Sequence, residues 1–206
     1  MITAGQMRIP DGDAYFQRVF ARTGDRFQAE LFQRALRYTP GRKIAIDIGA
    51  HVGSLTRQMA VHFASVIAFE PNPLNFACLQ ENATASTVAH FNVALGADEG
   101  YCDMAQHADN SGCWRVIPGG AVRIAPLDSF AFENVDLIKI DVEGFEGQVI
   151  RGAQQTIAAC DPTIVFEDNG LGPKLYSSAW VDPRKLLAEL GYRRRERFEK
   201  DEIWTR

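Results

Sequence analysis

Short apolar segments that alternate with amphipathic ones constrain the fold of this 206-residue chain more than any other feature. The apolar segments are rich in β-branched residues, as buried strands are, and the segments between them place apolar residues at helical spacing. We expect strands at residues 43–49, 66–71, 88–95, 136–141 and 163–167. We expect helices at residues 27–38, 54–63, 72–84, 144–159 and 183–190. This order predicts an α/β fold in which helices cover both faces of a mostly parallel sheet.

Two further segments depart from this alternation. Residues 191–205 have the pattern of two polar strands, and an antiparallel hairpin there would close one edge of the sheet. Residues 97–127 have no helical pattern, so we expect an inserted loop or hairpin there that is functional or carries its own small strands. We expect one domain over residues 1–206, in which residues 1–42 form an N-terminal helical extension.

The composition narrows the class of protein. Hydrophobic residues at 46% and charged residues at 23% are typical of a globular chain, and a net charge of −4 does not favour a general polyanion binder. No segment approaches the roughly 18 consecutive apolar residues of a membrane span, and the first residues lack a signal-peptide pattern. We therefore expect a soluble, cytoplasmic protein without a membrane partner. Free thiols are expected at the four cysteines, which form no C-x-x-C pair: Cys78, Cys102, Cys113 and Cys160.

The junction between the first predicted strand and the first helix after it resembles a ligand-binding loop. Gly49 and Gly53 in "DIGAHVG" would let the backbone turn tightly, and the helix that follows offers free N–H groups to an anion. Glu70 ends the next strand, where an acid can accept hydrogen bonds from both hydroxyls of a ribose. Together these features favour an adenosine-type cofactor, with a purely structural use of the glycines as the alternative.

The charge near this loop distinguishes between adenosine-type cofactors. The spacing of Gly49 and Gly53 differs from the G-x-G-x-x-G pattern of dinucleotide-binding enzymes. Asp47, at the end of the first strand, would repel a pyrophosphate and attract a cationic group. S-adenosylmethionine has a ribose, a carboxylate, an ammonium and a sulfonium, so it agrees with this pattern better than NAD does.

Five motifs in this order resemble the FkbM-type family of S-adenosylmethionine-dependent methyltransferases. They are "DIGAHVG", "FEPNP", "NVALG", "LDSF" and "IKIDVEGFEGQVIRGA", and the resemblance runs from about residue 43 to residue 167. It implies a Rossmann-like class I methyltransferase fold, with a seven-stranded sheet whose last strand is antiparallel. It also implies O-methylation of a sugar or another small molecule.

The resemblance also implies which residues bind the cofactor. The loop of residues 47–53 would surround the methionine portion, Glu70 would hold the ribose, and Asp141 would face the amino acid end or the transferred methyl group. Residues 71–72 and 92–94 would shape the adenine pocket. Family members often have asparagine at the position of His51, which keeps a polar group there. The implied contacts are Asp47, Gly49, His51, Gly53, Glu70, Pro71, Asn72, Asn92, Val93, Ala94 and Asp141.

Methylation of a hydroxyl also requires a group that accepts its proton. The candidates are Asp141, Glu143, Glu167 and, in the insertion, His107. If the chain stays extended, Asp141 and Glu143 point to the same side, where they could raise one another's pKa or share a divalent cation. We assign no metal ligand. A helix-start acid is the alternative for Glu143, and a solvated side chain the alternative for His107.

Several charged residues near the candidates have simpler interpretations. We expect Glu146 to be a first-turn helix acid, Asp168 to cap a turn, and Lys139 to pair with an acid. The basic run of residues 193–197 is expected on solvated faces of the hairpin, with contact to nucleic acid as the minority alternative.

The motifs together favour a methyltransferase that uses S-adenosylmethionine to methylate a hydroxyl of a sugar or another small molecule. One alternative keeps the methyl donor and takes a nucleotide or nucleic-acid base as the acceptor. The other is a module that binds S-adenosylmethionine without catalysing a reaction. The sequence does not determine the acceptor, the oligomeric state or a requirement for a metal.

Overall fold

One seven-stranded sheet forms the centre of the molecule in this computed structural model, which describes residues 1–106 and 110–206, the side chain of Asp25 excepted. Its strands are β3 (Ile44–Ile48), β4 (Ser65–Phe69), β5 (Val88–Phe91), β10 (Val135–Ile140), β11 (Thr163–Glu167), β12 (Arg193–Phe198) and β13 (Asp201–Thr205). They are arranged in the order β12-β13-β11-β10-β3-β4-β5. Only β13 runs opposite to the others, because it pairs antiparallel with both β11 and β12. The predicted class I sheet with an antiparallel last strand is therefore confirmed.

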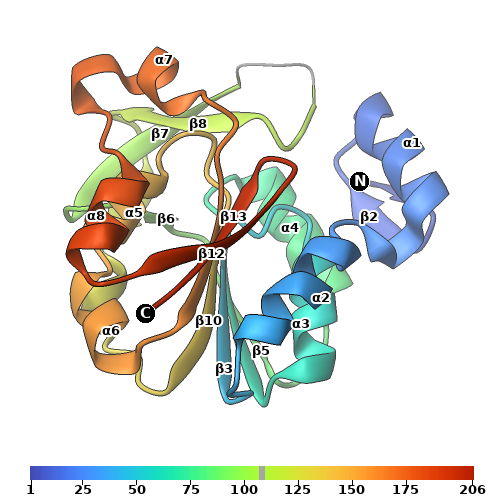
Figure 1. Ribbon diagram of the computed structural model, residues 1–206. Helices are drawn as coiled ribbons and strands as arrows, with labels where there is room; N and C mark the ends of the chain where they lie inside the picture. Colours follow the sequence, from blue (N-terminus) through green and yellow to red (C-terminus); the bar gives the residue numbers. More distant parts are fainter. Residues whose placement is uncertain (107–109) are drawn as a thin grey trace.

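Helices cover both faces of this sheet (Figure 1). One face carries α2 (Ala29–Tyr38), α3 (Ser54–His62) and α4 (Pro73–Asn82). The other carries α5 (Glu146–Arg151), α6 (Gln154–Cys160) and α8 (Pro183–Glu189). Because both faces are covered, alternate residues of one strand are buried in different hydrophobic cores. Ile138 packs in the core with α5 and α6, whereas Leu137 packs in the core with α2 and α3. Burial on both faces explains why the strands read as continuous apolar runs.

The start of α4 follows directly from its sequence. The side chain of Asn72 accepts hydrogen bonds from the backbone N–H groups of Leu74 and Asn75, at 2.9 and 3.2 Å. Pro73 occupies the first helical position, where no intrahelical N–H bond is lost. The predicted start at residues 72–73 is confirmed, and it fixes the chain that follows β4.

A second, smaller sheet lies beyond the carboxyl ends of the main strands (Figure 1). It has the order β6-β9-β7-β8, with β6 (Ala94–Leu95), β7 (Gly100–Gln106), β8 (Trp114–Pro118) and β9 (Val122–Ala125). The predicted single strand at residues 88–95 is wrong, because β5 stays in the main sheet and β6 joins the small one. Asn92 marks the break: its amide donates to the carbonyls of Glu70 and Pro71, at 2.8 and 3.0 Å.

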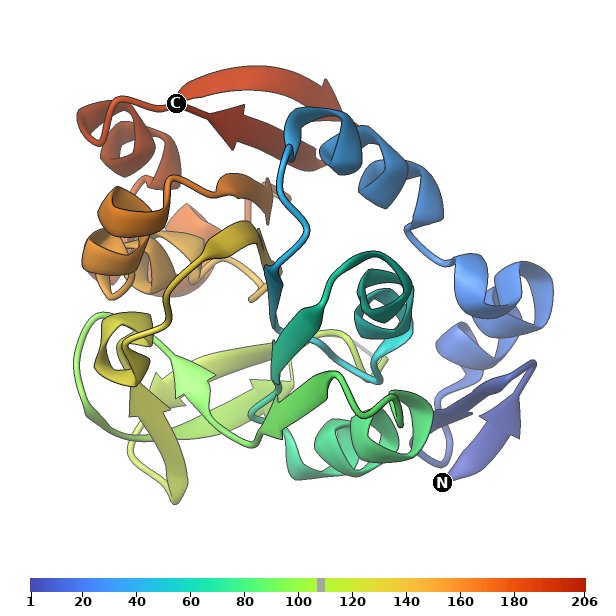
Figure 2. The ribbon, with the colours of Figure 1, turned by 90° about the horizontal axis from the view of Figure 1, so that it is seen from below.

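The N-terminal segment contains a hairpin that the sequence analysis did not predict. Strands β1 (Ile2–Ala4) and β2 (Met7–Ile9) pair antiparallel before α1 (Ala14–Thr23). Figure 2 shows the hairpin beside α4. There Asn82 accepts a hydrogen bond from the Arg8 N–H at 2.7 Å and donates to the carbonyls of Arg8 and Val52. Residues 1–42 are thus partly β structure, and the hairpin is tied to the loop that follows β3.

The predicted helix at residues 144–159 is divided into two helices, α5 and α6, and the break between them begins at Gly152. A side chain at Gly152 would place its Cβ 1.9 Å from the carbonyl oxygen of Gly96, so close packing requires glycine there. The remaining helical elements are α7 (Gly172–Tyr176) and the short 3₁₀ turns η1 (Gly24–Arg26), η2 (Leu127–Phe130) and η3 (Ser177–Ala179).

Two further expectations concern thiols and membranes. The four cysteines are free; Cys78 and Cys102 are buried, and Cys113 and Cys160 are partly buried. Within residues 1–106 and 110–206, no helix has the length and apolar character needed to cross a membrane.

Candidate active site

A cavity of about 660 Å³ opens at the carboxyl ends of β3, β4, β10 and β11. This is the edge at which open α/β sheets bind their ligands. Its walls also include Phe27 and Gln28 before α2, Trp114 and Val116 of β8, and the turn between β12 and β13. The main sheet thus supplies the floor, while the N-terminal segment and the small sheet supply the sides.

The loop after β3 brings its backbone directly into this cavity. Gly49 has φ +77°, and the N–H groups of Gly49 and Ala50 both donate to the carbonyl of Phe69, at 3.0 Å each. A Cβ on Gly49 would lie 1.9 Å from the carbonyl oxygen of Asp141. Only glycine fits this crossing, which holds the ends of β3, β4 and β10 together.

Asp47 is a buried carboxylate on the cavity wall. Its side chain accepts a hydrogen bond from the Thr56 hydroxyl at 2.6 Å, and the residue is 2% exposed. Burial raises the pKa of Asp47 from 3.8 to about 6, although the bond from Thr56 and the charge of Lys139 oppose that rise. Asp47 therefore carries a charge near neutral pH with little water around it, which favours a cationic partner.

Glu70 lines the same cavity at the end of β4. Its two carboxylate oxygens accept hydrogen bonds from the backbone N–H groups of His51 and Asn72, both at 2.9 Å. Burial raises its pKa from 4.5 to about 7, although these two bonds and Asn75 oppose that rise. The two backbone bonds fix the carboxylate in place, and its remaining lone pairs can accept hydrogen bonds from a ligand.

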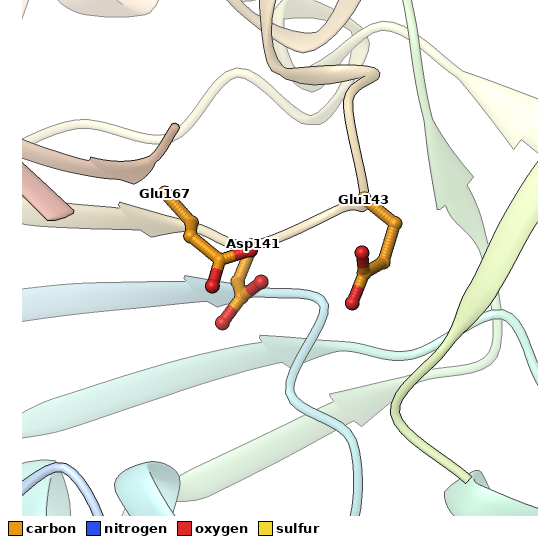
Figure 3. Close-up of side chains that lie close together, drawn as sticks. All are labelled: Asp141, Glu143 and Glu167. Atoms are coloured by element: carbon orange, nitrogen blue, oxygen red, sulfur yellow. The ribbon is translucent and has the colours of Figure 1, made fainter. Parts of the chain in front are cut away.

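Asp141, Glu143 and Glu167 lie close together on the wall of the cavity (Figure 3). One carboxylate oxygen from each lies within 4.8 Å of the others. The predicted extended chain from Asp141 to Glu143 is wrong, although the two acids do lie close together. Glu143 has φ +55° and Gly144 φ +96°, so the chain turns sharply after β10 and the turn returns the Glu143 side chain toward β11.

The environments of these three acids differ. Burial, with the charges of Asp141 and Glu167, raises the pKa of Glu143 to about 8. Burial and the charge of Asp141 raise the pKa of Glu167 to about 7. Burial would also raise the pKa of Asp141, but Lys139, whose Nζ lies 3.1 Å from Asp141 Oδ2, holds it below its usual value. Asp141 therefore stays charged, whereas Glu143 and Glu167 can each take up or release a proton near neutral pH.

Asn169 joins two of these acids, and sequence reasoning missed it. Its side-chain nitrogen donates to Glu143 Oε2 at 3.1 Å and to Glu167 Oε2 at 2.6 Å. Its side-chain oxygen accepts from the Leu171 N–H at 3.0 Å. The sequence pattern predicts no role for Asn169 itself and a turn cap only at Asp168 beside it. The signal in the sequence is the spacing of two residues between Glu167 and Asn169.

Not all of the predicted cofactor contacts line the cavity. His51, Pro71, Val93 and Ala94 do line it, together with Asp47, Gly49, Glu70 and Asp141. Asn72 and Asn92 do not: Asn72 caps α4, and Asn92 is exposed and bonds to backbone carbonyls. Gly53 also lies off the cavity, where a Cβ would meet Leu79 Cδ1 at 2.7 Å. These three residues shape the loops rather than the cavity surface.

The two candidate histidines have different outcomes. His51 has φ +52° and its Nε2 lies 2.7 Å from the Ser111 hydroxyl. Burial lowers its pKa to about 4, so its ring is neutral at physiological pH. His107 lies outside the described residues.

Of the simpler interpretations of nearby charged residues, two are confirmed and one is wrong. Glu146 is confirmed as a first-turn acid of α5, and its carboxylate accepts from the Gly144 N–H at 3.0 Å. Lys139 pairs with Asp141, as predicted. The capping role predicted for Asp168 is wrong, because its carboxylate pairs with Arg184.

Two arginines of the basic run on β12 form ion pairs with a glutamate of the neighbouring strand. Arg194 and Arg197 contact a carboxylate oxygen of Glu202 at 3.0 and 3.5 Å, and Arg184 contacts the same oxygen at 3.1 Å. Glu202 is 0% exposed. Arg194 and Arg197 are exposed, as the predicted solvated faces require, and from there both side chains reach a buried charge on β13 that requires partners.

Comparisons with known proteins find a family and a relative to which this chain is similar. A family model described as a methyltransferase FkbM domain matches residues 47–194. The chain is 28% identical over 152 residues to the hexuronic acid methyltransferase AglP of Haloferax volcanii. That match covers 69% of this chain and 60% of the relative, so the chain spans less than two thirds of the relative's length.

Solved structures show the same fold. A methyltransferase FkbM from Methylobacillus flagellatus KT has a TM-score of 0.55 at 17% identity, and the match covers 80% of this chain and 44% of that one. Magnesium protoporphyrin IX methyltransferase from Synechocystis PCC 6803, solved with bound SAM, has a TM-score of 0.52 at 12% identity. That match covers 95% of this chain and 85% of the other.

Proposed function

The chain belongs to the FkbM methyltransferase family, and from this premise we propose that it transfers a methyl group from S-adenosylmethionine to a hydroxyl of a sugar or a similar small molecule. The observation that carries the proposal is the convergence of Asp47, Glu70, Asp141, Glu143 and Glu167 on one cavity at the carboxyl edge of the sheet. The similarity to a hexuronic acid methyltransferase supports a sugar as the acceptor.

The residues of the cavity fit the methyl donor. The Ser54 hydroxyl and the Asn75 side-chain oxygen are buried, have no hydrogen-bond partner among the described residues, and belong to residues that line the cavity. Ser54 is 6% exposed and Asn75 is 3% exposed. Buried polar atoms of this kind are available for hydrogen bonds with a polar ligand. Gly49 adds a backbone that a ligand can approach closely.

The charge of the cavity fits as well. Among the described residues, eight acidic side chains line it, against the basic side chains of Arg26, Lys139 and Lys200. When bound, S-adenosylmethionine supplies an electrophilic methyl group on a positively charged sulfur. Asp47 and Asp141 would favour its cationic end, and Glu70 would accept hydrogen bonds from its ribose hydroxyls.

The acceptor side has the groups that a hydroxyl acceptor needs. Glu143 or Glu167, in its ionised form, would accept the hydroxyl proton while the oxygen keeps its electron pair as the nucleophile. The raised pKa values of both carboxyls, about 8 and about 7, suit a proton acceptor near neutral pH. Trp114, Val116 and Phe145 give this side of the cavity apolar surface on which a sugar ring can pack.

A shared proton agrees with the contacts of the three acids better than a shared divalent cation. Lys139 already donates to Asp141, and Asn169 donates to Glu143 and Glu167. These N–H donors occupy one oxygen of each carboxylate, which leaves fewer oxygens for a cation. The pairing of Arg194 and Arg197 with Glu202 likewise weakens the case for a nucleic-acid acceptor.

Calorimetric titration tests the donor. We expect S-adenosylmethionine and S-adenosylhomocysteine to bind, NAD not to bind, and Glu70→Ala to weaken binding of the first two at least tenfold, which equals about 1.4 kcal/mol. Glu133→Ala serves as the matched control, because Glu133 is exposed and lies just before β10, at the opposite end of the sheet. Binding of neither donor compound, or equal affinities in the two variants, would contradict the proposal.

A radiolabelled-methyl screen tests the acceptor. The compounds to offer are neutral sugars, hexuronic acids, nucleotides and single-stranded RNA. Transfer to a sugar hydroxyl is the expected result. Transfer only to nucleotides or RNA would replace the sugar with a nucleic-acid acceptor, and binding without transfer to any compound would identify a non-catalytic module.

A further inference from the structure

We propose that Asn169 is a positioning residue that holds Glu143 and Glu167 together as one proton-accepting pair. The inference rests on the proposed transfer to a hydroxyl and assigns a role to a residue that the family match alone does not distinguish. Asn169 itself does not line the cavity, whereas both glutamates do. It therefore acts through the glutamates and has no contact with the acceptor.

The hydrogen bonds of Asn169 define its orientation. A side-chain amide has two N–H donors on its nitrogen and acceptor lone pairs on its oxygen. In Asn169 the nitrogen faces two carboxylates, at 3.1 and 2.6 Å, and the oxygen faces the Leu171 N–H at 3.0 Å. The opposite orientation would point the oxygen at two carboxylates and the nitrogen at an N–H donor, so it is excluded. Both N–H donors are thus committed to the two glutamates.

The two glutamates need a connection because they come from different strands. Glu143 stands in the turn after β10, and Glu167 is the last residue of β11. The loops that follow these strands touch through their backbones: a Cβ on Gly144 would lie 2.7 Å from the Cα of Gly172. This contact sets the distance between the loops, and Asn169 sets the distance between the side chains.

Electrostatics explains what the amide does for the pair. Two carboxylates this close repel one another, and the repulsion raises the pKa of both groups. A carboxylate with a higher pKa is a stronger base, but a smaller fraction of it is ionised at neutral pH. Asn169 lowers the pKa of Glu143, because an N–H donor stabilises the ionised form. Lys200 Nζ, 3.7 Å from Glu167 Oε1, approaches the opposite oxygen of that carboxylate. The amide therefore keeps a usable fraction of the pair ionised near neutral pH.

The substitution Asn169→Asp tests this role with little change in shape. It replaces both N–H donors with a third acidic group and keeps an oxygen that can accept from the Leu171 N–H. We expect the acidic limb of kcat/KM, which reports the ionisation of the proton acceptor, to move up by about one pH unit, so that activity at pH 7 falls about tenfold and recovers at pH 9. The KM for S-adenosylmethionine should stay unchanged, because Asn169 does not line the cavity and its side chain bonds to Glu143, Glu167 and the Leu171 N–H rather than to a residue assigned to the donor.

Asn134→Asp is the matched control. Asn134 lies just before β10, at the opposite end of the sheet, and its side-chain oxygen accepts from Lys43 Nζ at 2.8 Å. A carboxylate there keeps that partner, so the pH profile should equal that of the wild type. Asn169→Ala is a second variant, which removes the N–H donors without adding a charge. It should shift the limb in the same direction by a smaller amount.

Carbon-13 NMR of the glutamate carboxyl groups provides a readout without turnover. Single Glu143→Gln and Glu167→Gln variants assign the two signals. In Asn169→Asp, both carboxyls should titrate at higher pH than in the wild type. If the wild type transfers no methyl group but both carboxyls still shift, the proposed function fails and the role of Asn169 stands. Unchanged titrations in Asn169→Asp and Asn169→Ala would overturn the inference, whatever the activity.

Discussion

The hydrogen bond from Thr56 to Asp47 should control both the stability of the fold and the charge of the cavity. Thr56 is 0% exposed, and its hydroxyl donates to a carboxylate that is itself 2% exposed. Thr56→Val keeps the shape of the side chain and removes only this donor. The buried carboxylate would then lose a partner that water does not readily replace.

The size of the effect follows from the charge of the acceptor. A hydrogen bond to a charged group contributes about 1.5–3 kcal/mol, whereas one to a neutral group contributes about 1 kcal/mol. Loss of the larger amount raises the pKa of Asp47 by about one to two units above its value of about 6. At pH 8 we therefore expect a loss of about 2 kcal/mol in the free energy of unfolding. At pH 5, where Asp47 is mostly protonated in both proteins, the loss should shrink to about 1 kcal/mol or less.

The sign follows from proton binding. The pKa of Asp47 in the folded protein lies above its ordinary value of 3.8, so the folded state binds the proton more tightly than the unfolded state. The contribution of Asp47 to stability is thus greatest below about pH 4 and is lost as the pH rises through about 6. In Thr56→Val the same loss continues to a higher pH and is larger.

Urea denaturation at pH 5 and pH 8 measures both values. Thr39→Val is the matched control, because Thr39 is 2% exposed and its hydroxyl donates to the neutral carbonyl of Ala35 at 2.9 Å. The control should lose a similar amount of stability at both pH values. Equal losses at pH 5 and pH 8 in Thr56→Val would refute the argument that Asp47 is ionised in the folded protein near neutral pH.

Three further predictions follow from the same structure. Gly49→Ala should abolish binding of S-adenosylhomocysteine in calorimetry and lower the melting temperature, because its Cβ would overlap the Asp141 carbonyl; unchanged binding would contradict the crossing described for this loop. Glu202→Gln should lower the free energy of unfolding by about 3 kcal/mol in urea, since Arg184 and its neighbours lose a buried partner; a loss below about 1 kcal/mol would show that solvent replaces the pair. Asn72→Ala should cost about 1 kcal/mol of stability as a lost helix cap, and a normal helix signal with unchanged stability would argue against that cap.

Features that depend on neighbouring residues could be predicted from the sequence. The start of α4 needs only Asn72 and Pro73, and strands β3, β4, β10 and β11 follow from their apolar runs. The acids at the ends of β3, β4, β10 and β11 could also be placed on one edge, because parallel strands end together. These elements are local, or follow from the topology alone.

Features that depend on contacts between distant segments could not be predicted. The turn at Glu143 and Gly144 forms because the loop packs against Gly172, which is far away in the sequence. The strand expected at residues 88–95 divides because Asn92 binds the carbonyls of the preceding loop. Asn169 looked like an ordinary turn residue because its partners are brought to it only by the fold.

The arginines of β12 also affect how the molecule behaves at high concentration. β12 is one of the two outermost strands of the seven, so one row of its backbone N–H and C=O groups has no neighbouring strand within the sheet. Such an edge can pair with the edge of another molecule and begin aggregation. Arg193 and Arg195 are exposed on this strand and give its edge a positive charge. Two copies would repel one another there, so the strand sequence that closes the sheet also protects it from edge-to-edge association.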